Sequence, residues 1–276
     1  MTRLRIVTIN TGKGDGRYRR RMAWLAEELT RLAPDIVLLQ EALRTADGAL
    51  GTVATLADGL GMAAAFAPAR RKNRLVEGER LDTWSGLGLL SRSAAFRTER
   101  LSLPDHPDDG ERVALLGCWQ PFDGVSLVIA NVHLTHLRGQ DALRARQFAA
   151  LLAHPWLTGS AGITLVGGDL NTAPADLGPL RAVAGPRHLT DTYTAGGGEP
   201  GRVTVPVGRP DDPGARLDYL LVVGDDGTQA PGWSGARVVL DRPDPDGVYP
   251  SDHYGIMVDL HLPQGDEGSS EDERRD

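Results

Sequence analysis

The sequence contains a single cysteine, few aromatic residues and no long hydrophobic run. The one cysteine, Cys118, excludes an internal disulfide framework and a zinc site made of several thiolates. No apolar stretch approaches the roughly 18–20 residues that a membrane-spanning helix needs, so we expect no membrane span. The start of the chain has the pattern of a β-strand and not of a secretory signal. We therefore expect a soluble, cytoplasmic protein, and we expect it to be a monomer.

Several common catalytic motifs are missing as well. The chain holds no HExxH motif, the usual zinc site of metalloproteases, and no GxSxG motif around a nucleophilic serine. The segment Thr11–Gly16 (TGKGDG) has the composition of a phosphate-binding loop but lacks the GxxxxGK[ST] spacing. Arg17 also stands where GxGxxG requires its last glycine. We interpret this segment as a flexible turn, the more common role of isolated glycines.

The chain has 276 residues, enough to bury a large hydrophobic core. No internal repeat or linker divides it, so we predict one domain over residues 1–263. Residues 264–276 contain six acidic residues, two arginines and no apolar side chain, which predicts a disordered acidic tail. This tail carries much of the net charge of −7, so the body of the chain is nearly neutral and indicates no strongly charged partner.

Arginine accounts for nearly all of the basic residues, since Lys13 and Lys72 are the two lysines among 30 Lys and Arg. The planar guanidinium group binds phosphate through paired hydrogen bonds, so a phosphate-bearing partner is one explanation. A general compositional bias toward arginine, alanine and glycine is the simpler explanation, and we favour it.

The order of predicted elements indicates an α+β fold in layers. Alternating hydrophobicity predicts a first strand over Leu4–Asn10, and a helical stripe predicts a helix over Arg19–Leu32. A short apolar run predicts a strand over Ile36–Gln40, Asp47 could cap a helix that ends at Leu60, and the polar segment Arg70–Arg80 is predicted to be a long loop. Further strands are expected at Gly86–Ser91, Val113–Trp119, Val125–His133, Ile163–Gly168, Leu217–Val223, Ala236–Leu240 and Gly255–Leu262, and further helices at Gln140–Ala153 and Asp176–Val183.

Acidic, amide and histidine side chains lie at the ends of these predicted strands. Because several strands can end on one rim of a sheet, we expect such side chains to meet there. The residues are Asn10, Glu41 (in LLQE), His133 (NVHL), Asp169 and Asn171 (GDLN), Asp218 (RLDY), and Asp252 and His253 (SDHYG).

Each of these residues alone has an ordinary explanation. Glu41 could lie near a helix start, His133 could be a structural histidine, and Asp169, Asn171 and Asp252 could serve turns. Their joint position at strand ends is harder to attribute to turn chemistry. Carboxylates suit Mg²⁺, imidazoles can neutralise charge on a reacting phosphate, and a carboxylate can position or deprotonate water. The pattern therefore indicates metal-dependent hydrolysis of a phosphoester.

The motifs LLQE, GLGLLSR, NVHL, GDLN, RLDY and SDHYG, in this order, resemble the endonuclease/exonuclease/phosphatase superfamily. That superfamily includes DNase I-like nucleases, abasic-site endonucleases, sphingomyelinases and inositol-phosphate 5-phosphatases. The resemblance runs from Asn10 to about Leu262, nearly the whole body. It implies a four-layer α/β/β/α sandwich of the DNase I type, in which two mixed sheets pack together with the active site at one end.

The resemblance also implies roles for the residues at the strand ends. Glu41 would be the principal ligand of Mg²⁺, or of Mn²⁺ in its place. Asn10 would lie near the metal, and Asp252 near the metal or the water. Asp169 would position and activate the attacking water, and Asn171 would hold a phosphate oxygen.

Two histidines complete the implied catalytic group. His253 would contact the scissile phosphate and be kept cationic by Asp218. His133 matches the second family histidine, the position that is tyrosine in abasic-site enzymes. The carboxylate partner of His133 stays open, with Glu79 and Asp82 as candidates.

Basic residues are candidates for substrate binding. Arg112 stands where many family members carry an arginine before a strand. Arg70, Arg71 and Arg74, with Lys72 among them, could hold a nucleic-acid backbone or a phosphorylated head group, although short charged runs are usually only solvated.

Members of this superfamily share a fold and a reaction but act on different substrates, so the resemblance does not identify the substrate. We predict Mg²⁺-dependent hydrolysis of a phosphodiester bond by direct attack of water, and we favour a nuclease. The absence of a recognisable membrane-binding helix argues against a sphingomyelinase-like phospholipid hydrolase, and short loops argue against an inositol- or sugar-phosphate phosphatase; both stay alternatives. A catalytically silent phosphate-binding module is a third hypothesis, which the complete set of site residues disfavours.

Overall fold

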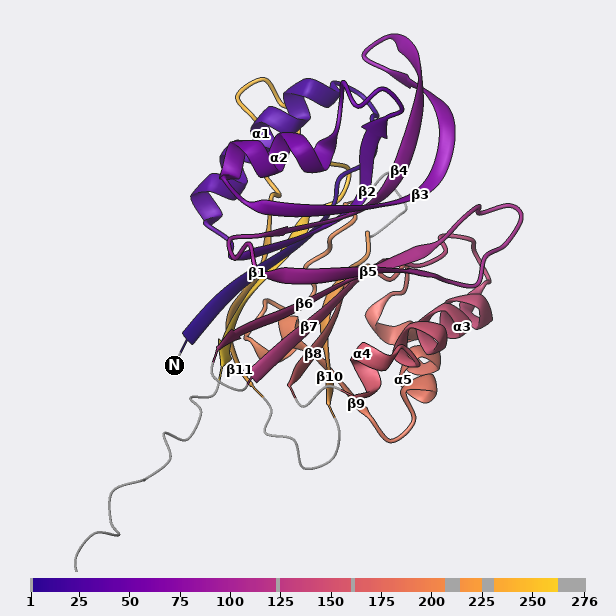
Figure 1. Ribbon diagram of the computed structural model, residues 1–276, viewed down its shortest axis with the longest axis vertical. Helices are drawn as coiled ribbons and strands as arrows, with labels where there is room; N and C mark the ends of the chain where they lie inside the picture. Colours follow the sequence, from indigo (N-terminus) through magenta and orange to yellow (C-terminus); the bar gives the residue numbers. More distant parts are fainter. Residues whose placement is uncertain (1, 123–124, 160–161, 207–213, 225–230, 263–276) are drawn as a thin grey trace, which may run out of the picture.

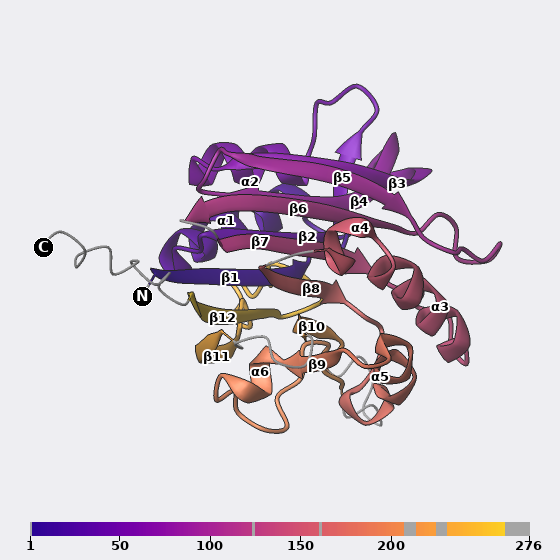
Figure 2. The same ribbon diagram turned by 60° about the horizontal axis from the view of Figure 1, so that its bottom comes forward.

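The computed structural model describes residues 2–122, 125–159, 162–206, 214–224 and 231–262. Two six-stranded mixed sheets pack face to face, and helices cover the outer face of each sheet (Figures 1 and 2). This architecture confirms the predicted four-layer α/β/β/α sandwich. In the described part of the chain, no helix is both long and apolar enough to cross a membrane. The predicted acidic tail, residues 264–276, lies outside the described residues.

The first sheet has the strand order β11-β12-β1-β2-β4-β3, with a parallel pair, β1 and β2, at its centre. Helix α1 (Tyr18–Leu32) makes the crossover between these two strands, and α2 (Thr52–Leu60) lies beside it on the same face (Figure 1). The strands are β1 (Thr2–Asn10), β2 (Ile36–Thr45), β3 (Ala63–Val76), β4 (Glu79–Ser91), β11 (Gly232–Val239) and β12 (Gly255–Leu262).

The second sheet has the order β5-β6-β7-β8-β10-β9, and its central parallel pair is β7 and β8. Helices α3 (Asp141–Leu152) and α4 (Pro155–Thr158) connect this pair, and α5 (Gly178–Ala184) packs beside α3. A 3₁₀ turn (Pro174–Asp176) precedes α5, and α6 (Thr192–Ala195) follows β9. The strands are β5 (Phe96–Ser102), β6 (Val113–Phe122), β7 (Val125–His133), β8 (Ile163–Asp169), β9 (His188–Asp191) and β10 (Asp218–Gly224).

Alternate side chains of the central strands serve different hydrophobic layers, as the two-residue period of a strand requires. On β1, Ile6 lies in the core between the two sheets, whereas Val7 and Ile9 pack against α1 and α2. On the other outer face, Phe148 and Leu151 of α3 pack on the second sheet. Each strand end is therefore held from both sides, which fixes the positions of the residues that follow it.

A buried polar network joins the two sheets beneath the strand ends. The Gln40 side-chain amide donates to the Thr8 hydroxyl at 3.0 Å and to the Asn131 side-chain oxygen at 2.8 Å. The Asn131 amide in turn donates to the carbonyls of Leu39 and Gly88, at 2.9 and 2.8 Å. Because unpaired polar groups are costly in a buried interface, this network favours one register of the two sheets.

The predicted loop over Arg70–Arg80 is wrong, since this segment belongs to the long hairpin of β3 and β4. The outer half of the hairpin extends beyond the sheet, and most of its residues on β3 are exposed, although Val76 near the tip is buried with the core beside α1 and α2 (Figure 1). Arg70–Arg74 is a run of basic and polar residues, so the apolar alternation that marks a half-buried strand is absent there.

Other boundaries differ by local causes. Strand β2 continues past Gln40 to Thr45 through a bulge, so Glu41 lies inside the strand instead of closing it. Asp47 does not cap a helix: its carboxylate accepts from the backbone of Ala49 in a turn, and α2 begins at Thr52. The exposed edge strands β5 and β9 were not predicted, because edge strands lack a continuous apolar side.

Candidate active site

Strand register places three of the predicted site residues in one row. His133 of β7 is paired with Asp169 of β8, and Asp169 is paired with Asp218 of β10. Paired residues on neighbouring strands project to the same side of a sheet, about 5 Å apart. Asn10 and His253 reach this row from the first sheet, at the end of β1 and just before β12.

Two glycines allow the first sheet to approach this row closely. A Cβ atom on Gly167 would lie 2.7 Å from a Leu38 methyl of the first sheet. A Cβ atom on Gly168 would lie 3.1 Å from Gln40 Nε2 of the first sheet and 2.0 Å from the Val132 carbonyl oxygen of the neighbouring strand β7. Gly168 also has φ +128°, which side chains disfavour. The sequence GGD therefore lets β8 deliver Asp169 to the interface between the sheets.

Three residues beside the row have left-handed backbone conformations, which non-glycine residues seldom adopt. Glu41 (φ 53°), Lys13 (φ 51°) and Asn171 (φ 47°) all line the same cavity. At Glu41 the conformation coincides with the register shift between Leu39 and Ala42. Such a bulge turns a side chain away from the alternation of its strand, and backbone strain of this kind concentrates at functional sites.

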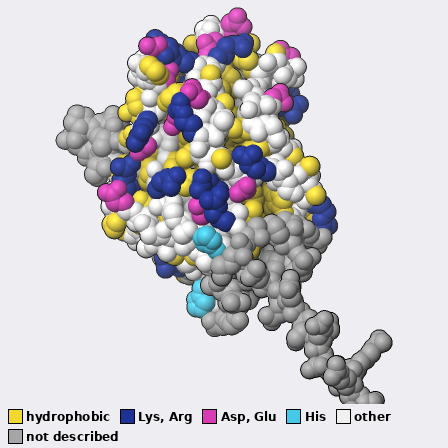
Figure 3. Space-filling view, turned by 90° about the vertical axis from the view of Figure 1, so that its left-hand side faces the viewer, with side chains coloured by type: hydrophobic (Ala, Val, Ile, Leu, Met, Phe, Trp, Pro, Cys, Tyr) yellow, Lys and Arg dark blue, Asp and Glu magenta, His cyan; other side chains and the backbone are white. Residues whose placement is uncertain are grey.

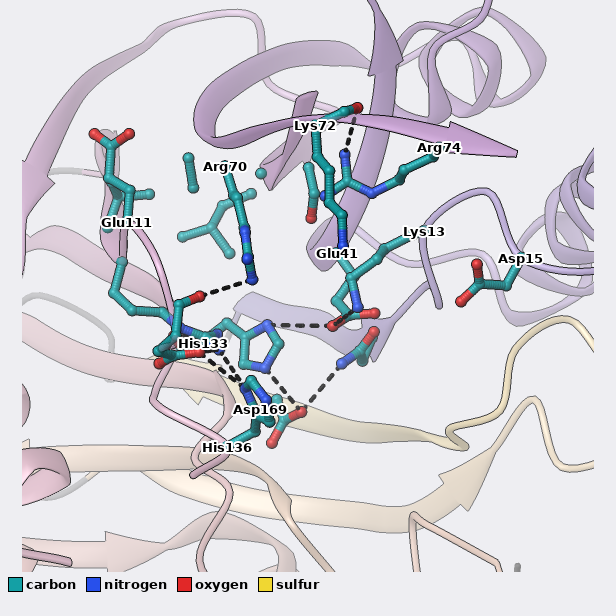
Figure 4. A pocket seen from close by; sticks show the side chains of 18 of the residues that line it. Lys13, Asp15, Glu41, Arg70, Lys72, Arg74, Glu111, His133, His136 and Asp169 are labelled. Atoms are coloured by element: carbon teal, nitrogen blue, oxygen red, sulfur yellow. Dashed lines mark hydrogen bonds and ion pairs between the residues drawn. The ribbon is translucent and has the colours of Figure 1, made fainter. Parts of the chain in front are cut away.

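These side chains surround a cavity of about 610 Å³ (Figure 4). One side of it, here named the strand-end wall, carries Asn10, Glu41, His133, Asp169, Asn171 and His253. A second group, named the basic wall, consists of Arg70, Lys72, Arg74, Arg112 and His136, of which Arg70, Lys72 and Arg74 lie across the cavity from His133 and Asp169 (Figure 4). Asp252 also lines the cavity, with its carboxylate 3.1 Å from the Ser251 hydroxyl. The structure thus brings together all of the predicted site residues except Asp218 and Arg71.

Asp218 lies behind His253 instead of in the cavity. Its carboxylate is fully buried and accepts a hydrogen bond from His253 Nδ1 at 3.0 Å. Burial alone would lower the pKa of His253, but the Asp218 carboxylate outweighs it and raises that pKa to about 10. His253 is therefore cationic at neutral pH, with Asp218 fixing its ring from behind.

Asp169 lies at the floor of the cavity and is almost fully buried. One carboxylate oxygen accepts from the Asn10 amide at 3.0 Å, and the other accepts from the Asn171 backbone at 2.9 Å. Burial, together with the charge of Asp218, raises the pKa of Asp169 to about 7, against the opposing effect of His253. A carboxylate with this pKa is suited to accept a proton near neutral pH.

His133 lies between two carboxylates. Its Nε2 is 3.5 Å from Asp169, and its Nδ1 is 3.9 Å from Glu41 (Figure 4). Burial, with the positive charges of Arg112 and Lys13, holds the pKa of His133 well below its usual range, so the ring is neutral.

The candidate partners Glu79 and Asp82 for His133 are therefore wrong. Glu79 is exposed on the hairpin, and Asp82 pairs with Arg71. Neither residue lines the cavity, although Lys72 and Arg74 of the paired strand β3 do.

Two groups of residues could hold a metal ion. Ligand atoms of Asp169, Asp218 and His253 lie within 4.8 Å of one another. Glu41 offers a second place: its carboxylate faces the cavity and already holds a cation, the Lys13 ammonium, at 2.7 Å (Figure 4). An oxygen donor open to a solvent-filled cavity fits Mg²⁺, which commonly binds one or two carboxylates and keeps several waters.

The basic wall includes some predicted residues and leaves out another. Arg112 lies with its guanidinium against Asp109, and Arg74 donates to the Thr83 hydroxyl at 2.7 Å. Arg71 was predicted to bind substrate, but it lies outside the cavity, paired with Asp82 and stacked over Trp84 with 5.5 Å from guanidinium to ring centre. Strand alternation explains this, because neighbouring residues of β3 project to opposite faces.

Lys13, Asp109 and His136 are among the cavity residues that sequence reasoning missed. Lys13 lies in the glycine-rich turn that was considered for phosphate binding, so its position was a usable signal. Asp109 and His136 lie in loops without a recognisable motif, and only the folded structure brings them together.

The face of the sandwich shown in Figure 3 carries arginine side chains interspersed with Asp, Glu and hydrophobic side chains. This mixture of charges agrees with a nearly neutral body.

Comparisons with known proteins agree with this fold. The Endonuclease/Exonuclease/phosphatase family model matches residues 7–253. The chain is similar to humanized D. rerio TDP2 carrying 14 mutations (TM-score 0.72, 18% identity, 94% of this chain and 99% of that one). It is similar to D. rerio TDP2 complexed with a single-strand DNA product (TM-score 0.71, 17% identity, 95% and 100%).

A third structure is an endonuclease/exonuclease/phosphatase from Beutenbergia cavernae DSM 12333 (TM-score 0.68, 24% identity, 94% of this chain and 72% of that one). No curated protein matches the chain significantly. Identities this low show the shared fold, which is that of the DNase I-like sandwich. The family match, however, extends over most of the chain, and the chain therefore belongs to the endonuclease/exonuclease/phosphatase family.

Proposed function

We propose that this protein is a Mg²⁺-dependent phosphodiesterase that cleaves nucleic acid by direct attack of water. The observation that carries the proposal is the row of His133, Asp169 and Asp218, with His253 bound to Asp218 at 3.0 Å beside a cavity. It joins a fixed cationic donor and a proton-accepting carboxylate, two groups that phosphoester hydrolysis requires.

His253 would act on the phosphate. Its Nδ1 is occupied by Asp218, so its Nε2 is the donor available to a phosphate oxygen in the cavity. A cationic donor that is already in place stabilises the negative charge that develops on phosphate oxygens in the transition state. Asp218 keeps both the charge and the orientation of the ring.

Asp169 would act on the water. The Asn10 amide and the Asn171 backbone hold its two oxygens, so the carboxylate cannot rotate freely. The water oxygen forms a bond to phosphorus, its proton passes to Asp169, and the bond from phosphorus to the ester oxygen breaks. The departing oxygen takes a proton from solvent.

Glu41 would hold the metal, as the Lys13 contact suggests. When bound there, Mg²⁺ would neutralise charge on the phosphate oxygens. Asn10 would lie beside this metal position. Its side chain is held by its contact with Asp169 and by the Gly12 backbone, which donates to it at 3.1 Å.

Nucleic acid is the substrate that the basic wall supports best. Arginine and lysine opposite a catalytic row can hold phosphates on either side of the scissile bond. The structural similarity to a TDP2 bound to single-strand DNA product points the same way.

A panel of substrates tests the proposal. Purified protein with Mg²⁺ should cleave single- or double-stranded DNA or RNA, and Asp169→Ala should remove that activity. Turnover of sphingomyelin or a sugar phosphate, with none on nucleic acid, would contradict the substrate assignment. Metal-dependent thermal stabilisation without turnover of any phosphoester would support a silent binding module instead.

A further inference from the structure

One buried carboxylate gathers three side chains of the basic wall, two arginines and a histidine. Asp109 has a fully buried side chain in the loop between β5 and β6. Its two carboxylate oxygens accept from Nε and Nη2 of Arg112, the first at 2.8 Å, and one of them lies 2.9 Å from His136 Nδ1. Its backbone carbonyl accepts from Arg70 Nη1 at 2.9 Å.

These three side chains come from three separate segments: β3, the end of the β5–β6 loop, and the loop after β7. Gly110 (φ +81°) lets the loop pack against Arg70, since a Cβ there would lie 3.1 Å from Arg70 Cδ. Gln147 ties two of the segments together, because it accepts from the Thr135 backbone at 2.9 Å and donates to the Pro104 carbonyl at 2.8 Å. The cationic group is therefore positioned before any ligand binds.

The charges of this group do not balance. Two guanidinium groups, those of Arg70 and Arg112, lie against a single buried carboxylate, and the nearby Glu111 is exposed and pairs with Arg100. Arg70 uses one of its five N–H donors on the Asp109 carbonyl, which leaves donors for a ligand (Figure 4). Arg70, Arg112 and His136 all line the cavity. The excess positive charge fits an anion.

The group lies close to the catalytic row. Arg112 Nη1 donates to the His133 carbonyl at 3.3 Å, and His136 follows His133 by three residues. Three residues of extended chain span at most about 11 Å. An anion held here would thus lie near a phosphate in contact with His253 and Asp169, within the reach of one nucleotide.

We infer that Arg70, Arg112 and His136, positioned by Asp109, bind a second phosphate group of the substrate, next to the phosphate that is hydrolysed. This inference rests on the proposed phosphodiesterase activity. It makes Asp109 a positioning residue: the carboxylate does not touch the substrate, but it holds the cations that do. It also defines the preferred substrate as one with at least two phosphates in sequence along a chain.

Binding of two small ligands tests the inference without turnover. Isothermal titration calorimetry with Mg²⁺ compares thymidine 3′,5′-bisphosphate with thymidine 5′-monophosphate. We expect the wild-type protein to bind the bisphosphate at least about tenfold more tightly, and Asp109→Asn and Arg70→Ala to reduce this ratio to about two or less. Arg71→Ala should keep the wild-type ratio, because Arg71 lies on the same strand outside the cavity.

Steady-state kinetics on short thymidine oligonucleotides distinguish a terminal phosphate from a bridging phosphate as the second phosphate that is bound. The ratio of kcat/KM for pTpT, TpTp and TpTpT to that for TpT shows whether a terminal phosphate on either side, or only a bridging phosphate, is held. We expect at least one of these ratios to be near ten in the wild type and near one in Asp109→Asn. The difference should arise from a higher KM in the variant and not from a lower kcat.

Thermal unfolding of each variant shows whether it is folded. If Asp109→Asn does not fold, Arg70→Ala replaces it as the test variant, because Arg70 is exposed. Equal binding of the mono- and bisphosphate by the wild type, with cleavage of TpT intact, would overturn the inference and leave the proposed function standing. No cleavage of any diester, with tighter bisphosphate binding, would overturn the function and keep the binding group.

Discussion

The two sides of the cavity are built differently. The strand-end wall consists of residues at the ends or bulges of central strands, which the hydrophobic layers and the Gln40–Asn131 network hold in place. The basic wall consists of a hairpin that extends beyond its sheet and of two loops, held together by Asp109 and Gln147.

This difference separates two tasks. The reaction needs groups at fixed distances, and central strands provide them because a shift of one strand would disturb the whole core. Substrate choice can vary with little effect on the core when it depends on loops. We therefore expect changes in the strand-end wall to affect every substrate, and changes in the basic wall to affect some.

The largest effect should follow loss of Asp169. Asp169→Ala removes the proton acceptor and leaves the Asn10 amide unpaired. We expect kcat on any cleaved diester to fall by about 10³-fold or more, as for groups that act at the transition state. Asp58→Ala, an exposed aspartate on α2, is the matched control and should keep full activity.

Asp218→Asn should lower the rate by about 10²-fold at pH 8, with a change in pH dependence. In the wild type, the pKa of His253 is about 10, so its cationic form persists through pH 9. Without the Asp218 charge, Asp169 and Asp252 alone oppose the effect of burial, so the pKa of His253 falls and the cation is lost at a lower pH than in the wild type. Rates measured from pH 6 to 9.5 check this, and an unchanged profile would remove Asp218 from the mechanism.

The network beneath the strand-end wall should matter for stability. Asn131→Ala removes one of the two hydrogen bonds of the Gln40 amide and the side-chain donor of two backbone carbonyls, so we expect the free energy of unfolding to fall by about 2 kcal/mol. Arg70→Ala on the basic wall should change it by less than about 0.5 kcal/mol. Urea denaturation of both variants measures the contrast, and similar losses in the two would weaken the distinction between the walls.

Glu41→Gln should raise the Mg²⁺ concentration needed for half-maximal rate by about tenfold or more, because a neutral amide binds a hard cation less well than a carboxylate does. Glu79→Gln, on the exposed hairpin, is the control. An unchanged requirement in Glu41→Gln would favour the group of Asp169, Asp218 and His253 as the metal site.

The smallest effect should come from the basic wall. Arg70→Ala should weaken oligonucleotide cleavage by about five- to tenfold and reduce the salt dependence of binding by about one charge. Arg71→Ala should have no such effect, since Arg71 pairs with Asp82. Equal losses in the two variants would mean that the hairpin acts by general charge alone.

The strand-end wall could be predicted from the sequence for a physical reason. His133, Asp169 and Asp218 border apolar strands, and strands that pair in register bring their ends together. The contacts of His133 with Glu41 and of Asn10 with Asp169 could not be predicted, because they join the two sheets and depend on how the sheets approach each other.

The basic wall could be predicted only in part. The segment Arg70–Arg80 was predicted to be a loop, and a loop gives no alternation of side chains. The opposite orientations of Arg70 and Arg71 on β3 therefore could not be predicted. Asp109 and His136 come from distant loops whose contact depends on the fold and not on a local pattern. The site residues that lie in loops could therefore be identified only from the structure.

A measurement of two variants on two substrates tests the central claim most directly. Rates of His253→Ala and Arg70→Ala are compared on bis(p-nitrophenyl) phosphate, a small diester, and on an oligonucleotide. The account predicts that His253→Ala loses activity on both, whereas Arg70→Ala loses activity on the oligonucleotide and keeps it on the small diester. Equal losses of Arg70→Ala on both substrates, or full activity of His253→Ala on the small diester, would contradict the account.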